Sequence, residues 1–346
     1  MGEIKDIPIF FDVDLTVTEE YQQIPLLKPH KEELRRKVEE AGLEYTDPRS
    51  YFRIQDLIGG NPGVNYLNLF VWEAKKGRML EGLTDKRLRK SGKKVKPSPG
   101  LAEGLKELKE RFKKQARLHY FLISVGIKPI IEGFVEAAGL EGVIDGIAAS
   151  EFTTDKKGII NGIKDVTTSF GKNAPMIGFM KGDRKLLDVT LFPGQYKFDY
   201  RDEIVVGDGF SDISMFSYAK KKGGTPVAVY KPGSYDEYQK AVASVGVWVD
   251  YVLPRDYSPE FITFDLLAEI IQNKLGRRCE FRPSSLYDYR KGKVRHQHEI
   301  DCIKAHLEEC SECSKFYRKT FVTPEGTKEV HDISVGLYDD SKHNAF

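Results

Sequence analysis

Residues 7–16 read Ile-Pro-Ile-Phe-Phe-Asp-Val-Asp-Leu-Thr. A compact apolar run that ends at a carboxylate predicts a buried parallel strand with a site at its carboxyl end. Asp12 and Asp14 stand two residues apart where this strand becomes a loop, so both carboxylates can reach one ligand. One of them can then act as a nucleophile while the other serves as acid and base. An exposed acidic turn is the alternative for this motif on its own.

The chain beyond residue 97 alternates between strand and helix patterns. Short apolar runs predict strands at residues 118–124, 144–148, 203–206, 225–230 and 247–252. Amphipathic stretches predict helices at residues 99–115, 128–138, 211–221, 234–244 and 259–274, and residues 151–166 predict a hairpin. Strands separated by helices of this length predict an α/β fold with a doubly wound parallel sheet. Residues 19–97 show helical patterns without a convincing central strand.

A second carboxylate pair follows another apolar strand. Residues 205–212 read Val-Val-Gly-Asp-Gly-Phe-Ser-Asp, with Asp208 in a turn between glycines and Asp212 at the start of a predicted helix. Carboxylate oxygens in such a turn are the hard ligands that Mg²⁺ prefers. Asp212 could instead only cap the helix, but that alternative leaves Asp208 unexplained.

Two further features can bind a phosphoryl group. Ser124, near the end of the strand at residues 118–124, can offer its hydroxyl and nearby backbone N–H groups to a phosphoryl oxygen. A lysine between this strand and the second carboxylate pair would hold phosphate and offset the crowded carboxylates. The candidates for this lysine are Lys172, Lys181, Lys185 and Lys197.

Taken in chain order, these four features resemble the motifs of the haloacid dehalogenase superfamily, and most closely its phosphoserine-phosphatase-like phosphatases, over residues 5–275. The resemblance implies a Rossmann-like catalytic core made of residues 1–18 and 98–276. It also implies that residues 19–97, inserted after the first strand, form a helical cap that closes over the site and selects the substrate.

The same resemblance assigns catalytic roles. Asp12 would attack phosphorus to give an aspartyl-phosphate, and Asp14 would protonate the leaving alcohol and then activate water. Ser124 and the lysine would bind phosphoryl oxygens. We favour Lys181 for the lysine, because the Met-Lys-Gly around it resembles the Lys-Gly that the phosphatase branch places before its last acidic motif. Lys172 is the second choice.

The resemblance further implies a Mg²⁺ site. Asp208 would bind the ion together with Asp12 and the backbone carbonyl of Asp14, and Asp212 would support the metal-bound water molecules or the lysine. Leu15 is a departure, since many members have glycine there, although related branches vary at this position. The second aspartate of the first motif argues for phosphate-ester hydrolysis or phosphoryl transfer, because haloacid dehalogenases and P-type ATPases lack it.

The cysteines lie apart from all of these motifs. All four cysteines and three of the seven histidines fall between residues 279 and 313, and residues 306–313 contain H-x3-C-x2-C. Thiolate and imidazole together are ligands that zinc prefers. The span 279–319 resembles the zinc-binding fold of anti-sigma factors, in which a distant Cys or His joins such a motif.

That second resemblance implies a structural Zn²⁺ ion with the ligands Cys279, His306, Cys310 and Cys313. Cys302 would be a buried apolar residue. If the ligands follow a different spacing along the chain, Cys302 or His298 would take the place of one of the four. We therefore expect a small zinc-binding helical domain at residues 277–319, followed by a β-leaning tail at residues 320–346.

Composition bears on nucleic-acid binding, on membrane association and on the cellular compartment of the protein. A net charge of +2 gives no global argument for binding nucleic acid or an acidic membrane surface. No apolar run approaches the ~18 residues that span a bilayer, and the N-terminus lacks a signal-peptide pattern. Because the cysteines are gathered in one patch as metal ligands would be, we expect a cytoplasmic protein.

The sequence therefore predicts a Mg²⁺-dependent phosphatase that acts on a small phosphorylated substrate, with a zinc module available to a protein partner. Two alternatives stay open. One is a non-catalytic regulatory protein that uses the fold as a scaffold and the zinc module for binding, and the other is a phosphotransferase or mutase. The retained acids of both motifs weigh against the scaffold, since a decayed site should have lost at least one of them.

Overall fold

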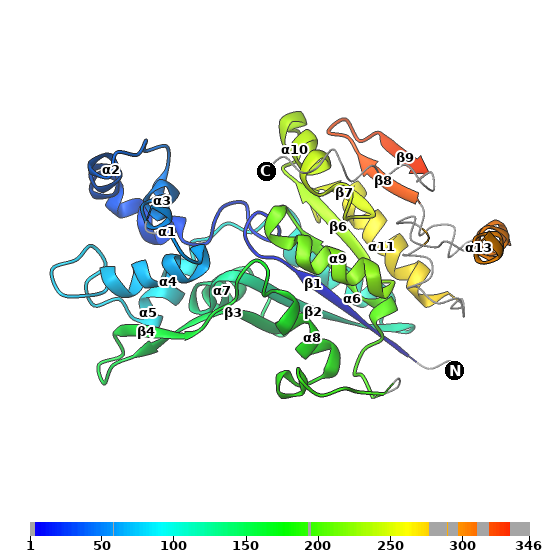
Figure 1. Ribbon diagram of the computed structural model, residues 1–346, viewed down its shortest axis with the longest axis horizontal. Coiled ribbons are helices and arrows are strands. Elements are labelled where there is room, and N and C mark those ends of the chain that lie inside the picture. Colours follow the sequence, from blue (N-terminus) through cyan, green and yellow to red (C-terminus); the bar gives the residue numbers. More distant parts are fainter. Residues whose placement is uncertain are drawn as a thin grey trace.

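The computed structural model describes residues 4–57, 59–192, 195–276, 289, 297–309 and 318–332. Within these residues, one sheet has the strand order β4-β3-β2-β1-β5-β6-β7-β8-β9 (Figure 1). The strands are β1 (Lys5–Phe11), β2 (Ala116–Ile127), β3 (Ile144–Thr154), β4 (Ile160–Asp165), β5 (Ile204–Gly207), β6 (Thr225–Tyr230), β7 (Tyr251–Pro254), β8 (Arg318–Val322) and β9 (Lys328–Asp332). The strand that precedes Asp12 therefore lies inside the sheet, between β2 and β5.

Parallel pairing dominates this sheet. Every neighbouring pair from β3 across to β8 is parallel, whereas β4 and β9 pair antiparallel at the two edges. The predicted α/β fold with a parallel sheet is thus confirmed, and the sheet is mixed because of its edges. The predicted hairpin is the β3–β4 pair. Strand β7 starts later than the sequence indicated, because residues 246–248 form a turn.

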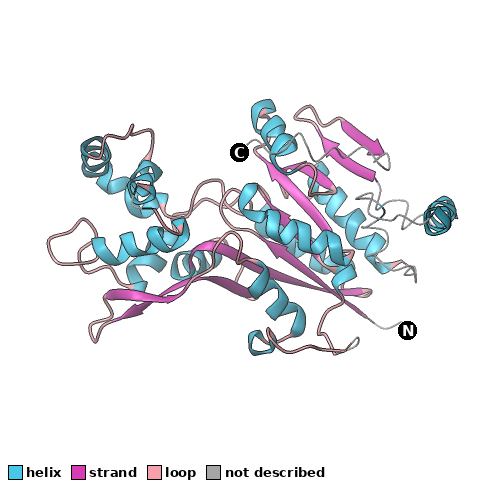
Figure 2. Ribbon diagram, viewed as in Figure 1, coloured by secondary structure: helices cyan, strands magenta, loops and turns pink. Residues whose placement is uncertain are grey.

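Side chains that alternate along β1 enter two hydrophobic cores. Ile7, Ile9 and Phe11 lie in one core and Phe10 lies in the other, because successive side chains of a strand point to opposite faces. The first core includes side chains of α6 (Leu101–Phe112), α7 (Lys128–Ala137) and α11 (Ile262–Leu275), and the second those of α8 (Asn173–Lys181), α9 (Ile213–Lys222) and α10 (Tyr235–Val245). Helices therefore cover both faces of the sheet (Figure 2), which is the doubly wound arrangement.

The chain between β1 and β2 forms a group of helices beside the sheet (Figure 1). These are α1 (Ile24–Leu27), α2 (Lys31–Glu40), α3 (Arg53–Asp56), α4 (Pro62–Glu73) and α5 (Asp85–Gly92). Thr18 and Pro97 pair in an isolated bridge where the chain leaves and re-enters the core. Helix α5 packs closely on α7, because a Cβ on Gly92 would lie 1.9 Å from the carbonyl oxygen of Ile130. The assignment of this insert as a cap stays a prediction.

The C-terminal part of the chain returns to the sheet. Strand β8 pairs with β7 and carries the β8–β9 hairpin, and the Tyr230 hydroxyl donates to the Val322 carbonyl at 2.7 Å. Residues 318–332, which the sequence divided between a zinc module and a tail, thus extend the main sheet. Of the predicted zinc ligands, His306 lies on α13 (Gln297–Glu309), while Cys279, Cys310 and Cys313 lie outside the described residues. The zinc site therefore stays a prediction.

Among the described helices, none is long and apolar enough to span a membrane.

Candidate active site

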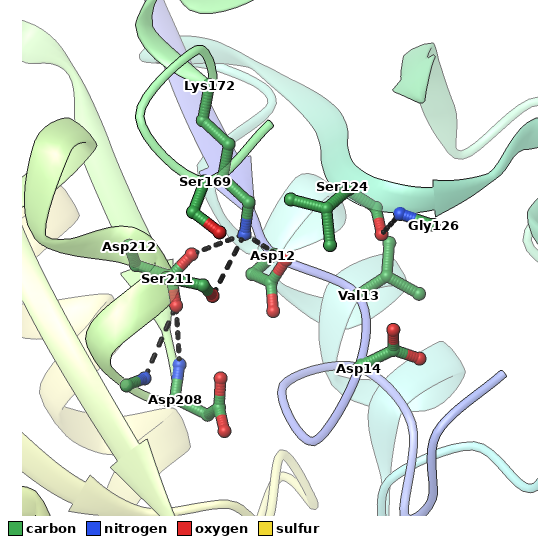
Figure 3. Close-up of polar contacts among 12 residues, drawn as sticks. Asp12, Val13, Asp14, Ser124, Gly126, Ser169, Lys172, Asp208, Ser211 and Asp212 are labelled. Atoms are coloured by element: carbon green, nitrogen blue, oxygen red, sulfur yellow. Dashed lines mark hydrogen bonds and ion pairs between the residues drawn. The ribbon is translucent and has the colours of Figure 1, made fainter. Parts of the chain in front are cut away.

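The predicted carboxylates and Ser124 gather at or near the carboxyl ends of β1, β2 and β5. These strands are adjacent and parallel, so their carboxyl ends share one edge of the sheet. The backbone N–H of Asp12 donates to the Val206 carbonyl at 2.9 Å, which holds the start of the first motif against β5. Asp12, Asp14, Ser124 and Asp208 consequently face one another across this edge (Figure 3).

The loop after Asp12 is a tight turn. The backbone N–H groups of residues 16–18 all donate to the carbonyl of Val13, at 3.0–3.2 Å. Leu15 has φ +57° and is the only non-glycine residue with positive φ in the described chain. A left-handed conformation costs a residue with a Cβ roughly 1 kcal/mol or more. This explains why the family that the sequence resembles often has glycine here.

Lys172 lies at the centre of the carboxylate cluster. Its ammonium is 2.6 Å from Asp12 Oδ1, 2.6 Å from Asp212 Oδ1 and 3.4 Å from Ser211 Oγ (Figure 3). The lysine is fully buried, at 0% exposure. Burial acts to lower its pKa, but the carboxylates of Asp12 and Asp212 outweigh burial and raise it, so the ammonium stays charged.

Lys181, which the sequence favoured for this position, lies elsewhere. It is in the last turn of α8, nine positions after Lys172, and its ammonium donates to the carbonyls of Leu186, Leu187 and Val189 at 2.7–2.8 Å. Gly182 ends α8 with φ +86°. The Lys-Gly pair is therefore a helix C-terminus, where glycine and a basic residue are common for backbone reasons. Of the two lysines, Lys172 is therefore the one that contacts the carboxylates.

Asp212 supports the loop that carries Asp208. Its Oδ2 accepts the backbone N–H groups of Asp208 and Gly209 at 3.1 and 3.3 Å, and its Oδ1 accepts from Lys172. A Cβ on Gly207 would lie 2.4 Å from Asp212 Oδ2, so the glycine leaves room for this carboxylate. Both oxygens of Asp212 are thus used within the protein, whereas the Asp208 carboxylate accepts no hydrogen bond from any residue that the structure describes.

These carboxylates can hold a divalent cation. Oxygens of Asp12, Asp208 and Asp212 lie within 4.8 Å of one another. Burial and the Asp212 carboxylate raise the pKa of Asp208 to about 7, and the same two causes raise the pKa of Asp12 well above its usual range. Lys172 pairs with Asp12 and Asp212, so the three carboxylates together exceed this one ammonium by two negative charges when all are ionised. A hard dication such as Mg²⁺ fits this charge and these oxygen donors.

Asp14 and Ser124 flank Asp12 on the other side. Both carboxylate oxygens of Asp14 accept hydrogen bonds from Gln22, and burial raises the pKa of Asp14 to about 6. The Ser124 hydroxyl accepts the Gly126 N–H at 3.0 Å and the Gln22 side-chain amide at 3.2 Å. Gln22 was not among the residues that the sequence indicated.

Arg255 is a second residue that the sequence analysis missed. It follows β7 at the same edge of the sheet and is only 5% exposed. Its Nε makes no hydrogen bond to the described residues, and burial lowers the pKa of its guanidinium while Asp208 and Glu19 act in the opposite direction. No local pattern distinguishes this arginine from the others, so only the fold places it here.

Comparison with known proteins finds similarity in structure alone. No protein-family model matches the chain, and no curated protein matches it. An apo phosphoserine phosphatase is 18% identical with a TM-score of 0.43, over 78% of this chain and 98% of that one. Cytosolic 5'-nucleotidase IIIB bound to cytidine is 12% identical with a TM-score of 0.46, over 77% of this chain and 86% of that one.

A predicted phosphatase from Clostridium acetobutylicum is 13% identical with a TM-score of 0.43, over 78% of this chain and 99% of that one. All three TM-scores lie below 0.5. The function proposed next therefore rests on the sequence motifs and the geometry of the site.

Proposed function

We propose that this protein is a Mg²⁺-dependent phosphatase of the haloacid dehalogenase superfamily, hydrolysing a phosphomonoester through an aspartyl-phosphate on Asp12. The observation that carries the proposal is the Lys172 ammonium, fully buried and 2.6 Å from Asp12 Oδ1, beside a cluster of carboxylates with excess negative charge. A structural ion pair does not require this excess. A site that binds a dication does.

In the first half-reaction, a carboxylate oxygen of Asp12 attacks phosphorus. A bond forms between this oxygen and phosphorus, and the bond from phosphorus to the ester oxygen breaks. Asp14 gives its proton to the departing oxygen, so that the product leaves as a neutral alcohol. Lys172 offsets negative charge near the attacked group, and the Ser124 hydroxyl donates to a phosphoryl oxygen.

In the second half-reaction, water attacks the phosphorus of the aspartyl-phosphate. Asp14, now ionised, takes a proton from that water. The bond between phosphorus and the Asp12 oxygen breaks, which releases phosphate and restores both aspartates. The raised pKa of Asp14, about 6, suits a group that must both give and take a proton.

Asp12 and Asp208 would hold the Mg²⁺ ion with the backbone carbonyl of Asp14, while Asp212 braces the Asp208 loop and Lys172. When bound, the ion would offset the charge of the phosphoryl group and so allow it to approach a carboxylate. Without that charge, the approach of two anions would be opposed.

The helical insert would act as a cap over this site. A Cβ on Gly63, in the first turn of α4, would lie 3.6 Å from Thr168, in the loop that leads to Lys172. This proximity brings the insert close to a catalytic loop, as exclusion of water and selection of a small phosphorylated substrate require.

The experiment is phosphate release from amino-acid, sugar, nucleotide and lipid phosphomonoesters with Mg²⁺. Asp12→Asn should lower the rate by on the order of 10³-fold or more. Asp6→Asn is the matched control, because Asp6 lies on the same strand at its opposite end, and it should keep the wild-type rate. Hydrolysis that survives Asp12→Asn would refute the mechanism. No hydrolysis of any ester would favour the scaffold alternative, and transfer to an acceptor other than water would identify a phosphotransferase.

We also propose that residues 277–319 bind a structural Zn²⁺ ion and offer a surface to a protein partner. The support is the ligand spacing of His306, Cys310 and Cys313, with Cys279 as the fourth ligand. Elemental analysis should find about one zinc per chain, lost in the double variant Cys310→Ser/Cys313→Ser. A metal-free wild-type protein with intact thiols would refute this site.

A further inference from the structure

Gln22 connects the two loops that carry the proposed acid and the proposed phosphate ligand. It lies between β1 and α1, is 1% exposed and uses both its backbone and its side chain. Its backbone N–H donates to Asp14 Oδ1 at 2.6 Å. Its side-chain Nε2 donates to Asp14 Oδ2 and to Ser124 Oγ, each at 3.2 Å. Gln22 thus contacts both oxygens of the acid and the hydroxyl of the serine.

The orientation of the Gln22 amide is determined by its partners. Its Oε1 accepts the backbone N–H of Ile127 at 3.0 Å. A flipped amide would present its NH₂ group to that N–H and its oxygen to the Asp14 carboxylate, so both contacts would become repulsive. The two hydrogens of Nε2 are therefore committed, one to Asp14 and one to Ser124.

This arrangement also determines what Ser124 can do. Its oxygen accepts hydrogen bonds from Gly126 N–H and from Gln22, which occupies both lone pairs. The hydroxyl hydrogen has no acceptor among the described residues and is left to donate. A phosphoryl oxygen is the acceptor that the proposed reaction would supply.

Gly126 leaves the space that the amide occupies. A Cβ at this position would lie 1.8 Å from Gln22 Nε2 and 2.4 Å from its Cδ. Gly126 does not have a positive φ, so its role here is close approach rather than backbone conformation. The three atoms nearest to such a Cβ all belong to the Gln22 side chain, so alanine at position 126 would displace its amide.

We propose that Gln22 is a positioning residue that holds Asp14 and Ser124 in one catalytic arrangement, directing Asp14 toward the leaving-group oxygen. This inference rests on the proposed phosphatase function. Gln22 itself touches neither the phosphoryl group nor the oxygen atoms that would bind the metal in this scheme, because it contacts the carboxylate of Asp14 and not its backbone carbonyl. It acts through the acid and the serine hydroxyl.

The test compares leaving groups. Loss of acid positioning should slow esters whose leaving alkoxide needs a proton far more than p-nitrophenyl phosphate, whose phenolate leaves without one. For Gln22→Ala, we expect kcat/KM to fall by on the order of 10–100-fold with an alkyl phosphate and by less than about threefold with p-nitrophenyl phosphate. A merely structural loss would lower both values equally, and that result would overturn the proposal.

Two further variants keep the test decisive. Gly126→Ala should reproduce the leaving-group pattern of Gln22→Ala, because it displaces the same amide from a different position. Gln23→Ala is the matched control: Gln23 is adjacent and 6% exposed, and its side chain makes no hydrogen bond to the described residues. Gln23→Ala should leave the ratio of the two kcat/KM values unchanged.

A double-variant cycle separates this inference from the proposed function. If Gln22 acts through Asp14, then Gln22→Ala should have little further effect on alkyl phosphate hydrolysis when Asp14→Asn is already present. Additive losses would show that Gln22 acts independently of Asp14 and would refute the inference. Wild-type protein that hydrolyses neither ester would instead refute the phosphatase assignment itself.

Discussion

Strand β1 carries an aspartate at each end, and the two lie in clusters of opposite charge balance. At the carboxyl end, Asp12 shares the single ammonium of Lys172 with Asp212, and Asp208 adds a further carboxylate nearby. At the amino end, Asp6 accepts two hydrogen bonds from the Arg117 guanidinium, each at 2.9 Å, and one from His119 at 2.7 Å.

The pKa directions follow this difference. Burial acts to raise the pKa of Asp6, but the hydrogen bonds from His119 and Arg117 outweigh burial and lower it. At the carboxyl end, burial and neighbouring carboxylates act together and raise the pKa values of Asp12 and Asp208. The amino-end cluster is a closed ion-pair network. In the carboxyl-end cluster, carboxylates are buried close together, and ionising all of them lowers the stability of the fold. Such a cost is expected where a cationic ligand binds.

The largest expected effect comes from removing the central cation. Lys172→Met should lower the rate of phosphate release by on the order of 10²–10³-fold. It should also lower the free energy of unfolding by about 3 kcal/mol or more, because the buried carboxylates of Asp12 and Asp212 lose the ammonium that they share. Phosphate release and urea unfolding measure the two effects. Lys181→Met is the control and should keep near-wild-type activity; the reverse result would restore the assignment that the sequence favoured.

Glu203 is an exception to this difference between the two ends of the strands. It lies at the amino end of β5, yet its pKa is raised. It is fully buried, neither of its carboxylate oxygens has a hydrogen-bond partner among the residues that the structure describes, and burial raises its pKa to about 8. The native state then keeps a proton that the unfolded state has lost, so stability falls as pH rises from the ordinary carboxyl pKa through about 8.

Glu203→Gln should therefore remove this loss of stability. Relative to the wild type, the variant should gain several kcal/mol in unfolding free energy above pH 8 and little at acidic pH. Urea unfolding across this pH range checks the prediction. A wild type and variant whose stabilities run parallel with pH would show that Glu203 is ionised and paired in solution.

Mg²⁺ binding should distinguish the two clusters directly. At 100 times its Kd, the ion should raise the free energy of unfolding by about 2.7 kcal/mol. A chelator should reverse this gain, and Asp208→Asn should abolish it. Asp6→Asn should retain it in full. Equal Mg²⁺ stabilisation of both variants would mean that the ion binds somewhere other than the Asp208 cluster.

The smallest expected effect belongs to the amino-end network. Because its members are partly exposed, Asp6→Asn should lower the free energy of unfolding by less than about 1 kcal/mol. Hydrogen bonds that the imidazolium of His119 donates to the carboxylates of Asp145 and Asp6 raise its pKa, despite burial. That contribution is complete below the ordinary imidazole pKa of about 6.5 and is lost as pH rises through the raised value. The loss in Asp6→Asn should accordingly shrink at alkaline pH, as thermal unfolding can measure.

Much of the fold could be predicted from local patterns. The apolar runs before Asp12 and Asp208 predict strands, because a buried strand appears in the sequence as a short run of consecutive apolar residues. The β8–β9 hairpin could not be predicted in this place, because a five-residue strand such as Arg318–Val322 does not specify its partner. Its pairing with β7 depends on an edge that forms only when the sheet is complete.

The sequence by itself determined which acids lie at strand ends, since Asp12, Asp14 and Asp208 each follow an apolar strand directly. Only the tertiary structure decided which lysine meets them. Lys172 and Lys181 lie at opposite ends of α8, and Asp12 is 160 residues from the lysine that contacts it. Gln22, Gly126 and Arg255 were likewise located by the fold alone. A strand end is a local property of the chain, whereas the partner of a buried charge depends on long-range packing that no short window of sequence contains.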